Sequence, residues 1–307
     1  MAVTTRFPVP GSGPAPVLQT GGMTLPAQAS LWSDAWRRLR RNRMALISTV
    51  LLVLLVAVAL ISTVWTPFRM SAIGVTETYA PPSSAHLLGA DELGRDILSR
   101  LMVGAQVSLI VGVGTQLLVL AIGVPIGLLA GYYRGPLDSV VTFVISVFYG
   151  IPDVLVAMIM VFLLGPSLAN IIIAIVATRW MDMARLVRGQ AMSLREREFV
   201  EAGRAAGARP PRMLFGHILP NALGPIIVQA TLGVPAAILF EAFLSFLGVG
   251  VQPPTPSWGS MASEGVAAIQ YAPHMVIAPS IALSLTLMAF NFLGDGLRDA
   301  LDPRSRR

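Results

Sequence analysis

Two carboxylates stand almost alone in long apolar stretches of this chain, and their position could support chemistry. Asp153 follows an Ile-Pro pair, and Glu241 lies inside the nearly uncharged stretch 213–247. A charged group at membrane depth is costly to bury, so it is a candidate for contact with a solute or an ion. Each carboxylate has an alternative role as a paired or snorkelled group near the membrane interface. For Asp153 we keep both interpretations open, and for Glu241 we favour the structural one.

The rest of the composition excludes several other kinds of chemistry. All 22 basic residues are Arg, so the chain has no Lys for a Walker A loop or a Schiff base. It has no Cys, which excludes thiol nucleophiles and Cys-based zinc sites. His86, His217 and His274 lie far apart in the sequence and suggest no metal site. We therefore expect no catalytic residue, no metal and no cofactor in this chain.

The elements that hold the two carboxylates are predicted to be transmembrane helices. Apolar residues make up 54% of the chain and charged residues only 12%, whereas soluble domains carry about 25% charge. A spanning helix needs about 20 apolar residues. Stretches long enough, with few charges, are 44–68, 101–133, 139–178, 213–247 and 265–294.

The stretch 139–178 is too long for one helix. Gly165-Pro166 predicts a turn that divides it, and Gly150 with Pro152 predicts a break just before Asp153. The helix after Gly165-Pro166 is the weakest span, because Arg179, Asp182 and Arg185 fall within it.

Charge supports that weak span. Eight Arg lie between residues 179 and 212, and the positive-inside rule places them on the same side as RRLRRNR at 37–43. Only an additional crossing achieves this. The sequence therefore predicts an all-α polytopic membrane protein with six transmembrane helices and cytoplasmic N- and C-termini. The formal charge of +6 reflects this topology, and we expect no nucleic-acid partner.

The predicted organisation follows the spans along the chain. The apolar run after the basic cluster is too long for the core of a signal peptide and is read as an uncleaved first span. The predicted parts are a largely disordered cytoplasmic tail with the basic cluster 37–43 (1–43), the first transmembrane helix (44–66), an extracytoplasmic segment and the helix that enters the core (67–102), a five-helix core (103–294) and a cytoplasmic C-terminus (295–307).

A polar segment, EFVEAGRAAGARPPRMLFGHILPN (198–221), interrupts the apolar pattern. Its acidic start suits a helix N-terminus, and Gly207 followed by Pro210-Pro211 ends the helix. The small residues between them would let a partner's surface approach the backbone closely. The segment is either a docking helix or an ordinary helix connecting two spans, and its residue types alone do not decide between these.

The same segment resembles the EAA loop of ABC-importer permeases, which fits into a groove of the ATP-hydrolysing subunit. The resemblance rests on Glu201-Ala202, on Gly207 and on His217-Ile218-Leu219-Pro220, and this chain has Gly203 where the family commonly has Ala. Three more stretches resemble the dipeptide/oligopeptide (DppC/OppC-like) permeases. They are LGADELGRDILSRLMVGAQVSL (88–109), LSFLGVGVQPPTPSWGSM (244–261) and NFLGDGLRDALDPR (291–304).

The resemblance implies a type I ABC-importer permease of the bacterial plasma (inner) membrane, a transporter subunit and not an enzyme. Its implied partners are a second homologous permease, two ATP-binding subunits that hold ATP and Mg, an extracytoplasmic substrate-binding protein, a di- or oligopeptide substrate and the lipid bilayer. Asp153 and Glu241 become candidates for the translocation path, where Asp153 could meet a peptide's amino group. Within the cytoplasmic coupling loop 188–217, the implied ATPase-coupling residues are Glu198, Glu201, Ala202, Gly203, Ala206, Gly207 and Arg209.

Two alternatives remain. The same type of permease could import nickel chelates, glutathione or another small solute. A stand-alone ion-coupled carrier or channel would favour buried charge relays and inverted repeats, which the sequence does not display.

Two structural expectations concern the extracytoplasmic side. Asp91 is predicted to cap a helix along which Glu92, Arg95, Asp96 and Arg100 pair, and Trp258 is predicted to lie at the membrane interface.

Overall fold

The computed structural model describes residues 36–301, and within this range the only β-pairing is one isolated bridge. The all-α prediction is confirmed. The predicted disordered tail 1–30 and the terminal RSRR lie outside the described residues. The helices are α2 (Arg43–Ile61), α3 (Ile97–Tyr133), α4 (Gly135–Tyr149), α5 (Asp153–Leu164), α6 (Leu168–Arg195), α7 (Glu198–Ala205), α8 (Pro210–Met213), the π-helical turn η1 (Leu214–Ile218), α9 (Leu219–Phe246), α10 (Trp258–Val266) and α11 (His274–Leu301).

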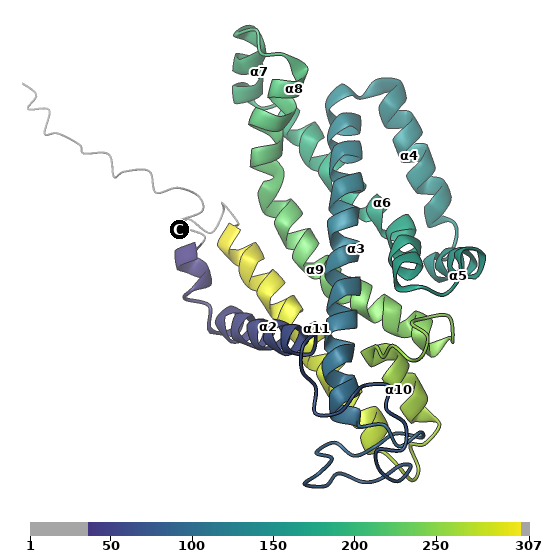
Figure 1. Cartoon of the computed structure of the whole chain (residues 1–307). Coiled ribbons are helices and arrows are strands. Elements are labelled where there is room, and N and C mark those ends of the chain that lie inside the picture. Colours follow the sequence, from purple (N-terminus) through teal and green to yellow (C-terminus); the bar gives the residue numbers. More distant parts are fainter. Residues whose placement is uncertain (1–35, 302–307) are drawn as a thin grey trace, which may run out of the picture.

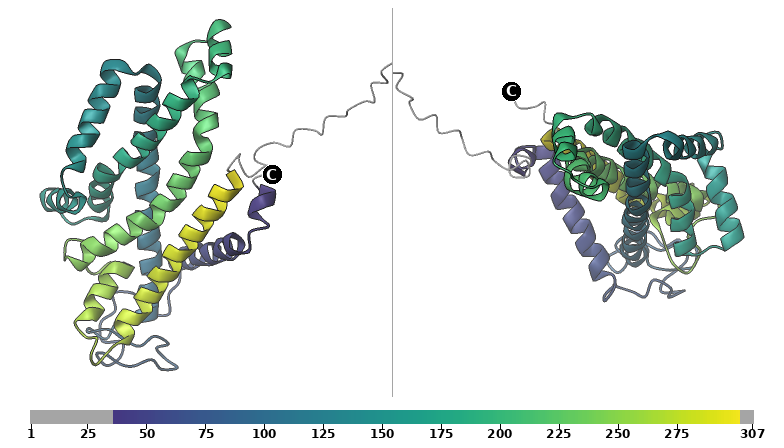
Figure 2. Two further views of the ribbon diagram at one scale, coloured as in Figure 1. Left: turned by 180° about the vertical axis from the view of Figure 1, so that it is seen from behind. Right: turned by 90° about the horizontal axis from the view of Figure 1, so that it is seen from above.

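Long helices connect the two ends of the molecule. Figure 1 shows α7 and α8 at one end, and α10 with the segment 62–96 at the other. Helix α3 runs between these ends and packs most extensively against α6, while α9 packs on α3, α6 and α11. The views in Figure 2 show α2 set apart from the core on the side of α11, which it contacts.

Four helical segments are long and apolar enough to cross a membrane: α2, α3, the continuous run α8–η1–α9, and α11. The pair α4 and α5 adds a fifth if the two are counted as one span, since they bend by 88° at the break between them. Helix α6 has 28 residues but is not among these spans.

Both predicted interruptions of the 139–178 stretch are confirmed. Helix α4 ends at Tyr149 and α5 begins at Asp153, with Gly150, Ile151 and Pro152 between them. The later turn falls where Gly165-Pro166 predicts it, because α5 ends at Leu164 and α6 begins at Leu168. Gly165 has a φ of +91°, which glycine adopts without the steric cost of a side chain.

A row of three glycines fixes the packing of α3 on α6. A methyl group on Gly127 would lie 2.5 Å from the carbonyl oxygen of Ala184, and one on Gly123 would lie 2.8 Å from that of Trp180. Gly131 meets the carbonyl of Arg188 in the same way, one turn further along. Small residues four positions apart let two helix backbones approach closely inside a membrane. Helices α3 and α6 therefore pack with their backbones in close contact.

A buried charge cluster holds the end of the molecule formed by α10 and the segment 62–96, and it corrects the expectation for Asp91. Asp91 does not cap a helix: its carboxylate pairs with Arg95 at 2.6 Å and with Arg100 at 2.8 Å. The cap of α3 is Asp96, which accepts from the Ser99 backbone N–H at 2.8 Å. Arg100 also reaches Glu264 on α10 at 2.9 Å, so tertiary partners and not helix termination decide the role of Asp91.

Trp258 is also not at an interface, because only 1% of it is exposed. Its indole Nε1 donates to the Leu101 carbonyl at 3.1 Å. Burial follows from the way α10 folds back against the start of α3, where the indole N–H finds the partner that a buried Trp needs.

Candidate functional site

The polar segment predicted as a docking helix forms α7. Glu198 and Glu201 lie in its first turn, where carboxylates interact favourably with the helix dipole. Its end is a Schellman motif: the Ala208 N–H bonds the Gly203 carbonyl at 3.0 Å and the Gly207 N–H bonds that of Arg204 at 2.9 Å. Gly207 has the positive φ of +80° that this motif requires. The sequence prediction of a short helix ended by Gly207 is confirmed.

Helix α7 is anchored by one face and exposed on the other. Val200 is fully buried in a cluster with Met213 and Leu214, and the Met213 sulfur would lie 3.0 Å from a methyl group on Gly203. Phe199 and Phe215 are 40% and 63% exposed, which adds apolar area to this surface. The sequence-predicted coupling residues that are exposed are Glu198, Glu201, Ala202, Ala206, Gly207 and Arg209, while Gly203 is half-buried.

Cationic side chains connect α7 to the ends of α3 and α6. The Arg195 guanidinium donates to the Tyr132 carbonyl at 2.5 Å. The guanidinium carbons of Arg195 and Arg204 lie 5.8 Å and 5.5 Å from the centre of the Tyr132 ring. Glu196 pairs with Arg134, and the hydrogen bond from that guanidinium holds the pKa of the Glu196 carboxyl below its ordinary value. Arg204 therefore joins α7 to the end of α3, while Arg195 and Glu196 join the end of α6 to the same place.

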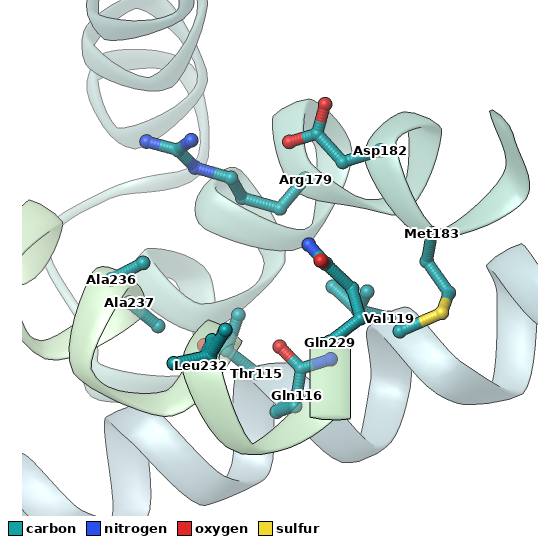
Figure 3. Close-up of a pocket in the computed structure, with 11 residues that line it drawn as sticks. Thr115, Gln116, Val119, Arg179, Asp182, Met183, Gln229, Leu232, Ala236 and Ala237 are labelled. Carbon is teal, nitrogen blue, oxygen red and sulfur yellow. The ribbon is translucent and has the colours of Figure 1, made fainter. Parts of the chain in front are cut away.

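A cavity of about 130 Å³ with both polar and apolar walls lies between α3, α6 and α9. Figure 3 shows Arg179 and Asp182 of α6 on one side and Gln116 of α3 with Gln229 of α9 on the other. We call this cavity the chamber. Its lining residues are Thr115, Gln116, Val119, Arg179, Asp182, Met183, Gln229, Leu232, Gly233, Ala236 and Ala237.

Asp153 lies at the edge of a second cavity, of about 300 Å³, that shares Arg179 and Asp182 with the chamber. Its carboxylate pairs with the Arg179 guanidinium at 3.1 Å. Asp182 accepts a hydrogen bond from the Tyr149 hydroxyl at 2.6 Å. Asp153 is thus paired, as one of the two interpretations predicts, and it also lines a cavity, so its place in a translocation path stays a prediction.

Arg179 and Asp182 themselves were not selected from the sequence as functional residues. Both are charges within a predicted membrane span, and such charges indicate a functional role. In the sequence analysis they were used only as the reason for the low hydropathy of that span. Thr115, Gln116 and Gln229 carry no charge and gave no comparable signal.

The substitution Asp153→Asn tests the role of the ion pair. Arg179 and Asp153 are 32% and 45% exposed at their side chains, and a pair of this exposure contributes about 1 kcal/mol or less. We expect normal folding and a few-fold reduction in uptake at limiting solute, because Arg179 loses the partner that orients it. Initial uptake rates at limiting and saturating solute measure this. Wild-type rates at both concentrations would remove Asp153 from the path.

Glu241 occupies a different environment from Asp153. It is fully buried and lines neither of the two cavities. Its Oε1 accepts from the hydroxyls of Ser245 and Ser257, each at 2.7 Å, so it joins α9 to the residue that caps α10. Its Oε2 is buried without a hydrogen-bond partner among residues 36–301.

We therefore expect Glu241→Gln to keep both serine contacts and to leave uptake within about two-fold of wild type, because the amide retains the accepting oxygen. Glu241→Ala removes the acceptor and should lower the free energy of unfolding by about 1–3 kcal/mol, since two buried hydroxyls lose their partner. Uptake and thermal unfolding in detergent separate the two effects. A Glu241→Gln protein that folds but does not transport would place Glu241 in the pathway.

Comparison with known proteins agrees with this architecture. The family described as "Binding-protein-dependent transport system inner membrane component" matches residues 123–307, and the "N-terminal TM domain of oligopeptide transport permease C" matches residues 30–82. The fold resembles an inward-facing structure of the MetNI methionine ABC transporter, with a TM-score of 0.56 and 21% identity over 66% of this chain and 96% of that chain.

Curated relatives match along nearly the whole chain. The dipeptide transport system permease protein DppC of Bacillus subtilis is 45% identical over 91% of this chain and 87% of its own length. The oligopeptide transport system permease protein OppC of the same organism is 41% identical over 91% of each chain. The glutathione transport system permease protein GsiD of Pectobacterium atrosepticum is 40% identical over 89% of this chain and 91% of its own. This chain therefore belongs to the family of binding-protein-dependent ABC-importer permeases, multi-pass proteins of the bacterial inner membrane.

Proposed function

We propose that this chain forms half of the translocation pathway of an ATP-driven importer of di- and oligopeptides. A second, homologous permease supplies the other half. Two ATP-binding subunits bind ATP and Mg on the cytoplasmic side, and an extracytoplasmic binding protein delivers the peptide. The chain itself transmits motion and contributes no step of ATP hydrolysis.

The observation that carries this proposal is the exposed face of α7. Because Val200 and Gly203 anchor the opposite face, the small and acidic residues point away from the core. A short helix with this surface suits insertion into a groove of a partner, with Phe199 and Phe215 supplying apolar contact. We propose Glu198, Glu201, Ala202, Ala206, Gly207 and Arg209 as the exposed coupling surface, with Gly203 contributing from behind by letting α7 pack closely on Met213.

The topology that we propose has six spans and places α7 in the cytoplasm. It counts α4–α5 as one span and includes α6 as a crossing helix. The charges of α6 support this assignment because they have partners: Arg179 pairs with Asp153, and Arg188 donates to Asp138 at 2.8 Å. Paired charges that face a cavity or another helix are compatible with a membrane span.

ATP-driven transport follows if the ATPases bind one conformation of the permease pair better than another. Closure of the ATPases on ATP would move both docking helices, and the permeases would alternate between inward- and outward-facing states. ATP can shift this equilibrium only by its differential affinity for the two states. In this chain the Tyr132 contacts of Arg195 and Arg204 provide the connection from α7 to α3 and α6.

Peptides are the proposed cargo because relatives named for dipeptide and oligopeptide transport match at 45% and 41% identity. Glutathione is the second candidate, since a relative named for its transport matches at 40%. The complete complex, reconstituted in proteoliposomes with its binding protein, should take up a labelled dipeptide only when ATP is present. If the complex takes up glutathione but neither dipeptides nor longer peptides, glutathione is the cargo and the peptide proposal is wrong. If no ATPase subunits co-purify with the permease, the proposal of an ATP-driven importer is wrong.

A further inference from the structure

We propose that the chamber contacts the backbone of the passing peptide, and that its glutamines, Thr115, Arg179 and Asp182 are the contact groups. Gln116, Gln229 and Thr115 would hydrogen-bond the peptide's amide groups. Arg179 and Asp182 would meet its carboxylate and its ammonium group. This inference rests on the proposed peptide cargo and adds the residues that meet it.

The first observation that supports this proposal is the Thr115 hydroxyl, which can form hydrogen bonds but lacks a partner in the described part of the chain. Thr115 is 1% exposed, and its hydroxyl is buried with no partner among the described residues. Four other helical threonines instead donate to a carbonyl of their own helix; these are Thr49, Thr178, Thr231 and Thr286. A buried hydroxyl without a hydrogen bond costs about 1–3 kcal/mol. A polar solute in the chamber would supply the missing partner.

Gln116 is the second support, because the fold makes room for its amide at the chamber wall. Gln116 is only 7% exposed, and it lines the chamber. Its amide carbon would lie 2.6 Å from a methyl group on Gly233 of α9, so any side chain at Gly233 would displace the carboxamide. Gly233 therefore lets a carboxamide, which carries two donor hydrogens and one acceptor oxygen, lie where α3 and α9 meet.

The charges provide the third support. Arg179 and Asp182 lie one turn apart on α6, so the chamber wall offers both signs of charge at short range. Arg179 uses one guanidinium nitrogen for Asp153, while its Nε is buried without a partner in the described part of the chain. Asp182 accepts from Tyr149 with one oxygen, which leaves the other for a further donor. Amides plus both charges complement a zwitterionic peptide better than a single ion.

Two variants test the proposal in the complete importer in proteoliposomes. Gln116→Leu removes the amide, and Gly233→Ala displaces it while leaving it in the chain. Gln106→Leu is the matched control, since Gln106 is on the same helix but lines the apolar groove between α2 and α3. Labelled dipeptide uptake is measured together with the ATP hydrolysis that the peptide-loaded binding protein stimulates.

We expect both chamber variants to lose about ten-fold in uptake at limiting dipeptide while stimulated ATP hydrolysis remains, because the contact is lost but coupling is intact. Gln106→Leu should transport like wild type. The chamber assignment is wrong if Gln116→Leu and Gly233→Ala take up dipeptide at the wild-type rate, or if Gln106→Leu loses as much uptake as they do. Either result leaves the proposed function unaffected. A wild-type complex that imports no peptide overturns the proposed function instead.

A second measurement detects the contact directly. A dipeptide carrying a photoreactive diazirine side chain, irradiated during turnover, should label α3 around Gln116 and α9 around Gln229. Labelling confined to the α2–α3 groove would contradict the proposal.

Discussion

Glu201→Arg should abolish ATP-dependent uptake and release the ATPases from the purified complex, while the permease still folds in the membrane. Glu201 is exposed in the first turn of α7, so its replacement leaves the buried contacts of Val200 unchanged. Arg reverses the charge on the proposed docking surface and adds a long side chain where small neighbours let a partner approach. It also places a positive charge at the positive end of the helix dipole, at a cost of about 0.3–1 kcal/mol, too little to unfold the protein.

Co-purification of ATPase subunits and uptake in proteoliposomes measure this effect. Ser193→Arg is the matched control, because Ser193 is exposed near the end of α6 and outside the proposed surface, and it receives the same new charge. Gly207→Pro should cause the same loss through the backbone, since Pro holds φ near −65° and Gly207 has φ of +80°. Wild-type uptake by Glu201→Arg would eliminate the proposed docking surface.

Gly127→Leu is expected to prevent the native packing of α3 on α6. Even a methyl group on Gly127 would lie 2.5 Å from the Ala184 carbonyl oxygen, and that atom belongs to the α6 backbone and cannot rotate away. The helices would have to separate, which also disturbs the neighbouring contacts of Gly123 and Gly131. We expect a loss of about 3 kcal/mol or more in stability, at the upper end of the cost of overpacking.

Gly114→Leu on the same helix is the control. A methyl group there would lie 3.6 Å from Ile172, which is an ordinary contact, and Gly114 borders an apolar groove with room for a side chain. The thermal midpoint for loss of monodisperse protein in detergent should fall strongly for Gly127→Leu and change little for Gly114→Leu. Equal midpoints would show that the close approach of α3 and α6 does not limit stability.

The local preferences of glycine and proline correctly predicted where helices break or end. Glycine and proline have strong backbone preferences of their own, so the breaks before Asp153 and at Gly165 and the end of α7 at Gly207 could be read from the sequence. Asp91 could not be assigned this way, because Glu264, which shares Arg100 with it, lies 164 residues beyond that Arg. Trp258 was misplaced for the same reason, since its partner Leu101 is brought to it by the tertiary fold.

The candidate sites differ in how far the sequence could define them. The proposed coupling residues all lie within one short segment, so their pattern could be recognised from the sequence. The chamber combines side chains from three helices, and an uncharged glutamine such as Gln116 differs little from any other polar residue in a span. The row formed by Gly123, Gly127 and Gly131 has a recognisable spacing, but only the structure identifies α6 as the helix it meets.

The close α3–α6 packing also affects how the helices around the chamber accommodate proline. Between Gln116 and Tyr132 the two backbones are in close contact, and this contact supports α3 around Pro125, where the helix lacks one hydrogen bond. Helix α9 has two such interruptions, at Pro225 and Pro235, and it follows the π-helical turn η1. The chamber therefore lies where a pair of helices in backbone contact meets a helix that proline interrupts twice.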